Sequence, residues 1–185
     1  MKLKLKIKDI GPGGVDSAHE MGAEALRSLL GAGGIELIGD DLTAQVVVHL
    51  SRVGETVLVR GGIKGVISVA CSRCLGPAPV RVDEPDLAVT FLPQALAGEE
   101  SEEERELTLE DLDTFTHDGL EIDIEPLVRE AFVLAVPIAP LCGEQCRGLC
   151  GECGTDLNRE SCQCSGSEVE DSPWVAALRR IKQAN

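Results

Sequence analysis

Residues 142–164 read CGEQCRGLCGECGTDLNRESCQC and hold six of the eight cysteines of the chain. The other two form a CxxC pair much earlier in the sequence. Within each pair one to three residues separate the cysteines, and tight turns at this spacing bring two thiolates to one metal ion. The pattern predicts two metal sites with four cysteine ligands each, formed by Cys71, Cys74, Cys142, Cys146, Cys150, Cys153, Cys162 and Cys164.

Zinc is the metal that the ligand set favours, because zinc accepts four sulfur ligands in a tetrahedron without redox chemistry. An iron–sulfur cluster is the alternative, since it too is held by four cysteine thiolates. Disulfides are typical of secreted proteins, whereas the N-terminal residues MKLKLKIKDI place a charge at every second position and do not form the apolar run of a signal peptide. A thioredoxin-like redox pair requires a helix after CSRC, and the sequence there is LGPAP.

The composition predicts a soluble domain with a small metal module. The chain has 185 residues, 43% of them hydrophobic, and no apolar run approaches the ~20 residues of a membrane helix. We therefore expect a cytoplasmic protein without a membrane partner. Only three phenylalanines and one tryptophan are present, so that Val, Leu, Ile and Ala must build the core.

The chain is strongly acidic, with a formal net charge of −15. A zinc ion bound by four thiolates carries a net charge of −2, so that two loaded sites would make the chain more negative still. Residues 99–106 read EESEEERE and are expected to form a solvated loop. A chain of this charge is repelled by phosphates at long range.

Period-two hydrophobic alternation predicts a mainly antiparallel β-sheet in the first half of the chain. Residues 2–8 alternate between lysine and apolar side chains, and further alternating runs predict the strands 42–50, 57–59, 63–69, 80–83 and 87–92. The CSRCLGPAP segment is then the turn of a β-hairpin that projects Cys71 and Cys74 from one end of the sheet. Between residues 2–8 and the strand at residues 42–50, residues 18–30 are predicted to form a short helix.

The second half is predicted to contain two further helices and a short strand. Residues 107–115 are expected to form a turn of helix and residues 120–124 a strand, after which Pro126 opens a helix that Pro137 ends. A terminal helix begins at Pro173. The fold class is therefore α+β, with an antiparallel sheet or partly open barrel, two or three packing helices and a C-terminal cysteine-rich zinc-binding segment. The predicted units are residues 1–140, 141–165 and 166–185.

The sequence resembles the YceD-like family, described as large ribosomal RNA subunit accumulation proteins. The resemblance rests on CSRCL, EIDIEPLVREAFVLAVPIAPLC, CRGLCGECGTDLNRESCQC and the closing PWVAALRRI, in this order, and covers about residues 40–183. It implies a factor needed for normal levels of 23S ribosomal RNA, often encoded beside a small basic protein of the large ribosomal subunit. No catalytic activity is established for the family.

The resemblance also implies how the cysteines divide, because some members of the family lack the last four. On that division Cys71 and Cys74 join Cys142 and Cys146 in a first site. The second site is then local to residues 150–164. Spacing alone equally allows a site formed by Cys142, Cys146, Cys150 and Cys153.

Three classes of function compete, and an enzyme is the least favoured of them. Sulfur can close both metal sites, whereas a catalytic zinc keeps an open position. The three histidines, His19, His49 and His117, are scattered along the chain, and no motif of a hydrolase or phosphate-binding loop occurs. The sequence therefore predicts a non-enzymatic protein without a small-molecule substrate.

The two remaining classes are an RNA-binding protein and a protein-binding assembly factor. Zinc-dependent binding of the 23S precursor would use a basic patch near the cysteines, for which the candidates are Arg73, Arg147, Arg159, Arg179, Arg180 and Lys182. The acidic charge and the few aromatic residues favour the second class, in which the partner is a small basic protein of the large ribosomal subunit.

Overall fold

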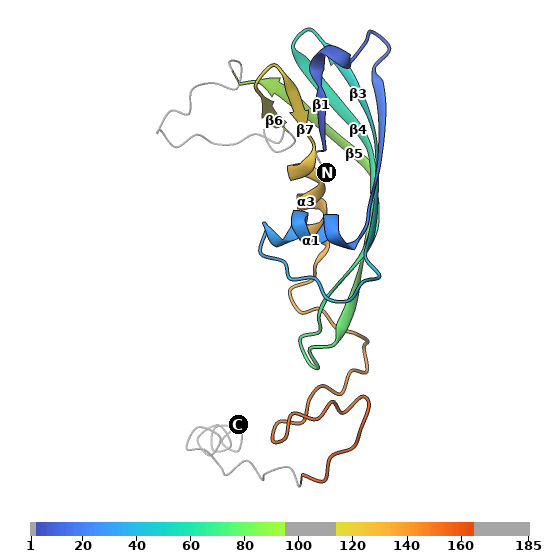
Figure 1. Ribbon diagram of the computed structural model, residues 1–185, viewed down its shortest axis with the longest axis vertical. Helices are drawn as coiled ribbons and strands as arrows, with labels where there is room; N and C mark the ends of the chain where they lie inside the picture. Colours follow the sequence, from blue (N-terminus) through green and yellow to red (C-terminus); the bar gives the residue numbers. More distant parts are fainter. Residues whose placement is uncertain (1–2, 95–113, 165–185) are drawn as a thin grey trace, which may run out of the picture.

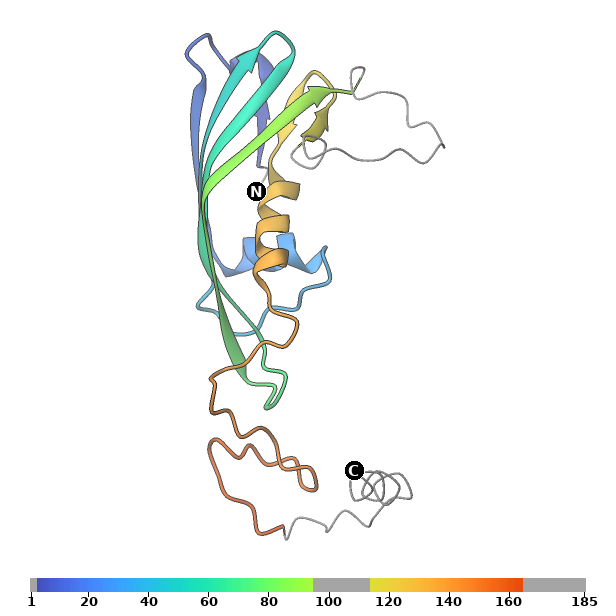
Figure 2. The same cartoon turned by 180° about the vertical axis from the view of Figure 1, so that it is seen from behind.

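The computed structural model describes residues 3–94 and 114–164 and has an α+β fold (Figure 1). A five-stranded sheet in the order β2-β3-β4-β5-β6 makes up most of it, and two short strands, β1 and β7, pair separately. The described helices, α1 and α3, lie against one face of the curved sheet (Figure 2). The predicted fold class is confirmed, with an open sheet whose edges are β2 and β6.

Three long strands form the centre of the sheet as an antiparallel meander. They are β3 (Thr43–Val53), β4 (Thr56–Ala70) and β5 (Pro77–Pro93). In β3, alternate residues from Ala44 to Leu50 are buried, as the hydrophobic pattern predicts. The sequence predicts two strands in the region of β4 and two in the region of β5, but each region forms a single strand. The pairing of β4 with β5 has one register shift, between Gly61 and Ile63 of β4. The apolar alternation is interrupted there, while the backbone pairing continues on both sides of the bulge.

The predicted helix at residues 18–30 is wrong over its first five residues. Strand β2 (Val15–Met21) pairs along its whole length with β3, and α1 (Ala23–Gly31) begins only after it. The helical spacing of Met21, Ala25 and Leu29 extended the prediction too far towards the N-terminus. Met21 ends the strand with its side chain buried, and the extended backbone of Gly22 turns the chain into the helix.

The N-terminal strand is shorter than predicted. β1 (Lys4–Lys6) pairs antiparallel with β7 (Glu121–Asp123), and a 3-10 helix, η1 (Ile7–Asp9), follows it. Leu3 and Ile7 are buried as the alternation predicts, because the 3-10 turn still directs Ile7 into the core.

The strand β6 (Thr114–His117) was not predicted, and it pairs in parallel with the end of β5. Thr114 and Phe115 lie in this strand rather than in the predicted turn of helix. Phe115 stacks on Phe91 of β5 with ring centroids 5.4 Å apart, which favours the extended conformation over a helical one. Three predicted segments lie outside the described residues: residues 107–113 of the predicted turn of helix, the acidic residues 99–106 and the terminal helix that begins at Pro173.

Helix α3 (Glu125–Ala135) begins and ends where the prolines predict. Its apolar side buries Leu127, Val128 and Phe132, and Phe132 is fully buried. No described helix is both long and apolar enough to cross a lipid bilayer.

The ring of Phe132 packs on the backbone of Gly65 in β4, and this contact leaves no room for a side chain there. A Cβ atom at Gly65 would lie 2.6 Å from the carbonyl oxygen of Thr43 and 2.7 Å from the Phe132 ring. We expect Gly65→Ala to lower the free energy of unfolding by about 1–3 kcal/mol, because the backbone oxygen cannot move away. Urea denaturation measures this change.

Gly13→Ala is the matched control, because nothing lies within 4 Å of a Cβ atom at Gly13. An equal unfolding free energy for the two variants would contradict the packing argument.

Candidate metal centres

The turn between β4 and β5, residues 71–76, places two cysteines on one side of the hairpin. The amide of Cys71 donates to the carbonyl oxygen of Gly76 at 2.8 Å, and the amide of Leu75 donates to that of Cys71 at 2.9 Å. Leu75 adopts a left-handed backbone conformation with φ 60°, which closes the turn. Cys71 and Cys74 are both buried as a result.

The chain after α3 meets this turn and completes a first cluster of four sulfurs. The amide of Ser72 donates to the carbonyl oxygen of Pro140 at 2.8 Å. Cys142 then lies beside Cys74, with their sulfurs 3.6 Å apart, and Cys146 lies beside Cys71 at 3.8 Å. We call this group, Cys71, Cys74, Cys142 and Cys146, the hairpin cluster, and its four sulfurs lie within 4.8 Å of one another.

The second cluster is formed locally by Cys150, Cys153, Cys162 and Cys164, whose sulfurs also lie within 4.8 Å of one another. We call it the terminal cluster. The amide of Cys150 donates to Thr155 at 2.8 Å, and the amide of Gly154 donates back to Cys150 at 3.0 Å. Gly154 has a φ of 73°, a left-handed conformation that glycine adopts without strain. The cysteines therefore group as the resemblance implied, and not as Cys142, Cys146, Cys150 and Cys153.

The sulfur geometry fits a tetrahedral metal ion. Four sulfurs at about 2.3 Å from a zinc ion lie about 3.8 Å from one another. The 3.6 and 3.8 Å separations in the hairpin cluster agree with this value and are far longer than the ~2.05 Å of a disulfide. Both clusters can therefore hold a metal ion, and each supplies four ligands of the type that zinc prefers.

The pKa values of the thiols indicate that each cluster favours one thiolate and resists a second. The amide of Arg73, which donates to the Cys71 sulfur, is the main cause that lowers the pKa of Cys71 to about 6. The neighbouring sulfurs of Cys146 and Cys74 raise the pKa of Cys142 to about 12. A divalent cation allows all four thiols to lose their protons, because its positive charge stabilises the four thiolates together.

The terminal cluster has the same asymmetry. The hydroxyl group of Thr155, 3.2 Å from the Cys153 sulfur, is the main cause that lowers the pKa of Cys153 to about 6. The sulfur of Cys153 in turn is the main cause that raises the pKa of Cys164 to about 12.

Asn158 links the two clusters. It lies in the loop of the terminal cluster, and its side-chain amide donates to the sulfur of Cys146 at 3.5 Å. Its side-chain oxygen accepts from the amide of Arg147 at 2.8 Å, while Asp156 accepts from its side-chain amide at 2.7 Å. Sequence reasoning assigned no role to Asn158. The only signal was its place within CRGLCGECGTDLNRESCQC, one of the stretches on which the family resemblance rests.

The predicted basic patch is only partly within the described residues. Arg73 and Arg147 are exposed beside the hairpin cluster, and the guanidinium group of Arg73 donates to the carbonyl oxygen of Cys146 at 3.0 Å. Arg159 is exposed in the terminal loop, where it lies 3.6 Å from a carboxylate oxygen of Asp156. The other candidates, Arg179, Arg180 and Lys182, lie outside the described residues.

The fold and the clusters define an α+β protein with one four-cysteine cluster at the tip of a long β-hairpin and a second one in the segment after α3. That segment extends past the hairpin (Figures 1 and 2). A family model described as "Large ribosomal RNA subunit accumulation protein YceD" matches residues 59–182. The chain belongs to this family, and the resemblance seen in the sequence is confirmed.

The chain is also similar to curated plant and mycobacterial proteins. It is 29% identical over 155 residues to the chloroplastic large ribosomal RNA subunit accumulation protein YCED homolog 1 of Arabidopsis thaliana, a match that covers 73% of the chain and 47% of the relative. It is 35% identical over 149 residues to an uncharacterized protein of Mycobacterium leprae, covering 78% and 63%.

An uncharacterized protein of Mycobacterium tuberculosis is 33% identical over 129 residues, covering 69% of the chain and 58% of the relative. The chain thus spans about half the length of the curated relatives that it matches. No solved structure gives a significant match to it.

Cys71→Ser is expected to remove one metal ion per chain and leave the terminal cluster loaded, because that cluster draws all its ligands from residues 150–164. Elemental analysis of the purified zinc-loaded protein measures the change. Cys162→Ser, which removes a ligand of the terminal cluster, is the reciprocal control and should also lose one ion. Loss of both ions in Cys71→Ser would contradict the independence of the two sites.

Asn158→Ala is expected to weaken zinc binding at the hairpin cluster by about tenfold, because it removes the hydrogen bonds that orient Cys146 and Arg147. Competition with a chromophoric chelator measures the affinity of both clusters in the otherwise unchanged chain, because the terminal cluster closes the loop that holds Asn158.

Gln145→Ala is the matched control, since Gln145 is exposed beside Cys146 and the structure records no side-chain hydrogen bond for it within the described residues. Equal affinities of the two variants would show that Asn158 does not position the ligand.

Proposed function

We propose that this protein is a non-enzymatic factor that supports 23S ribosomal RNA accumulation and large-subunit assembly by binding a small basic protein of the large subunit. Membership of the family described as large ribosomal RNA subunit accumulation proteins supports the ribosomal role. The observation that carries the choice of partner is the charge around the two cysteine clusters.

The region formed by residues 71–76 and 142–164, which we call the metal end, is negative. It contains three arginines and four carboxylates, Glu144, Glu152, Asp156 and Glu160. Zinc loading adds to this negative charge, because four thiolates outweigh one divalent cation at each site. Such a surface attracts a cationic protein and disfavours a phosphate backbone.

Two features support a non-enzymatic protein: the complete sulfur ligand sets of the clusters and the surroundings of the buried histidine. Each cluster supplies four sulfurs, which closes a tetrahedral site and leaves no position for water or substrate. The buried histidine, His117, has both ring nitrogens engaged, one with the carbonyl oxygen of Glu55 at 2.9 Å and one with the amide of Gly119 at 3.0 Å. A ring fixed by two backbone groups supports the fold and is poorly placed for proton transfer.

Direct contact with the 23S precursor is the second candidate function, and the exposed arginines beside the hairpin cluster support it. Arg73 is held by its bond to Cys146, and Arg147 follows that cysteine in the chain. Guanidinium groups presented by a rigid zinc turn can bind phosphates or stack on bases. This function would have to overcome the negative charge of the metal end.

The proposed partner should bind the purified protein with a steep dependence on salt, because opposite charges drive their encounter. Deleting residues 99–106, which carry six glutamates, should slow association by about tenfold and change dissociation less. Surface plasmon resonance with an immobilised small basic large-subunit protein measures both rates at several salt concentrations.

A variant with residues 99–106 in shuffled order keeps the charge and is the control. If the protein ignores the basic ribosomal protein at low salt and binds naked 23S RNA tightly, the RNA-binding function replaces the proposed one. Neutralising Arg73 and Arg147 should then abolish the RNA complex.

A further inference from the structure

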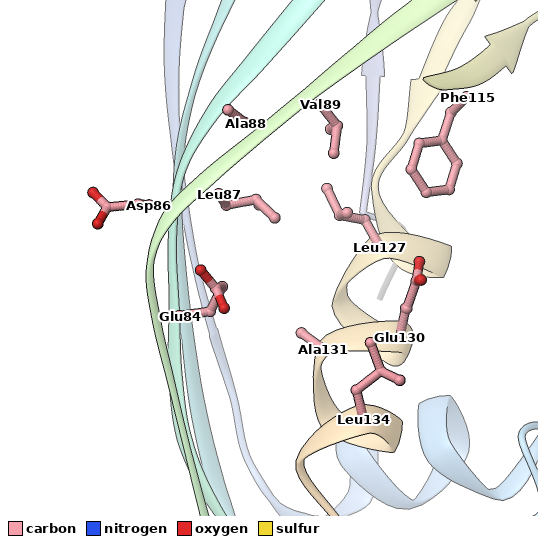
Figure 3. A pocket seen from close by; sticks show the side chains of 10 residues that line it. All are labelled: Glu84, Asp86, Leu87, Ala88, Val89, Phe115, Leu127, Glu130, Ala131 and Leu134. Carbon is pink, nitrogen blue, oxygen red and sulfur yellow. The ribbon is translucent and has the colours of Figure 1, made fainter. Parts of the chain in front are cut away.

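A groove lies between β5 and α3, away from the metal end (Figure 3). It has a volume of about 440 Å³. Leu87 of β5 and Leu127 of α3 point toward each other across it, and Leu134 extends its apolar side along the helix. Leu134 is 76% exposed, an unusual environment for a leucine that lines a groove.

Two carboxylates accompany this apolar surface, Glu84 from β5 and Glu130 from α3. Both are exposed, and the structure records no ion pair for either within residues 3–94 and 114–164. Asp86 also belongs to the groove wall, but its side chain points away from the space. No lysine or arginine is among the described residues that line the groove. The groove therefore presents an apolar floor with unneutralised negative charge.

The edge of β5 determines how a partner can enter. β6 pairs with β5 only from Thr90 to Pro93, so that in the described part of the chain the preceding edge of β5 has no neighbouring strand. Pro79 and Pro85 lie in this edge and lack the N–H group that a paired strand requires. A regular added strand is thus disfavoured, and a partner must engage the groove through its side chains.

We propose that this groove binds an amphipathic basic segment of a protein partner. Its apolar side chains pack on Leu87 and Leu134, while its lysines or arginines pair with Glu84 and Glu130. This arrangement is that of a helix laid in a groove, where apolar anchors supply affinity and flanking charges set orientation. The identity of the partner as a basic ribosomal protein rests on the proposed function, whereas the groove itself does not.

The test measures two probes against the full-length zinc-loaded protein. One is a fluorescent peptide of leucine and lysine with leucines at helical i, i+3, i+4 and i+7 spacing, and the other is the small basic large-subunit ribosomal protein. The variant Glu84→Gln with Glu130→Gln should weaken both complexes by about fivefold to tenfold, and Leu134→Ala should weaken them by about threefold to tenfold.

Two matched controls should bind as the unchanged protein does. Glu36→Gln with Asp41→Asn removes the same charge from the exposed loop before β3. Leu120→Ala truncates a leucine that is 71% exposed and lies elsewhere on the surface. All six substituted positions are exposed, and unchanged urea midpoints verify that each variant folds.

The outcomes separate the groove from the proposed function. If the ribosomal protein binds and the groove variants bind it as tightly as the controls do, the groove proposal is overturned while the proposed function stands. If the peptide alone binds and loses affinity in the groove variants, the groove stands and the ribosomal partner is wrong. A several-fold gain in peptide affinity on deleting residues 165–185 would identify the chain's own C-terminal segment as the occupant and overturn the proposal.

Discussion

The contact between the β4–β5 turn and the segment after α3 is the interaction on which the metal end depends. The sulfur pairs of the hairpin cluster join residues 68 and 75 positions apart in the sequence. Between residues 136 and 164 the structure contains no helix and only an isolated bridge between Leu149 and Asp156. Little apolar burial is available to such a segment, whereas structural zinc contributes on the order of 10 kcal/mol in small modules. Metal ligation at the two clusters would therefore supply most of its stability.

The sheet explains where the two centres lie. The turn shared by β4 and β5 projects beyond α1 and α3, and the segment after α3 continues past it (Figures 1 and 2). Cys71, Cys74 and Cys146 are buried there and belong to the hydrophobic core. Asn158 then fixes the terminal loop onto the hairpin cluster, because one side chain bonds to both parts. Hydrogen bonds thus join the two clusters at the end of the β4–β5 hairpin.

Much of this architecture could be predicted because the sequence patterns that indicate it involve residues close together in the chain. Alternation predicted β3, the prolines bounded α3, and the close cysteine pairs indicated two four-sulfur centres. Non-local pairing was not predictable in the same way. The parallel β5–β6 contact spans only four residue pairs, and Met21 fits a helical stripe as well as a strand end. Spacing also placed Cys146 equally well with Cys150, and only the fold, which brings the hairpin tip to residue 140, separates the two groupings.

The two surfaces differ in the kind of recognition that they can provide. At the metal end most of the carboxylates are exposed, and surface charge of this type mainly accelerates encounter and is screened by salt. In the groove, Glu84 and Glu130 flank apolar side chains, and apolar contact in a partly enclosed space mainly slows dissociation. A basic partner that reached both surfaces would be captured by the first and retained by the second.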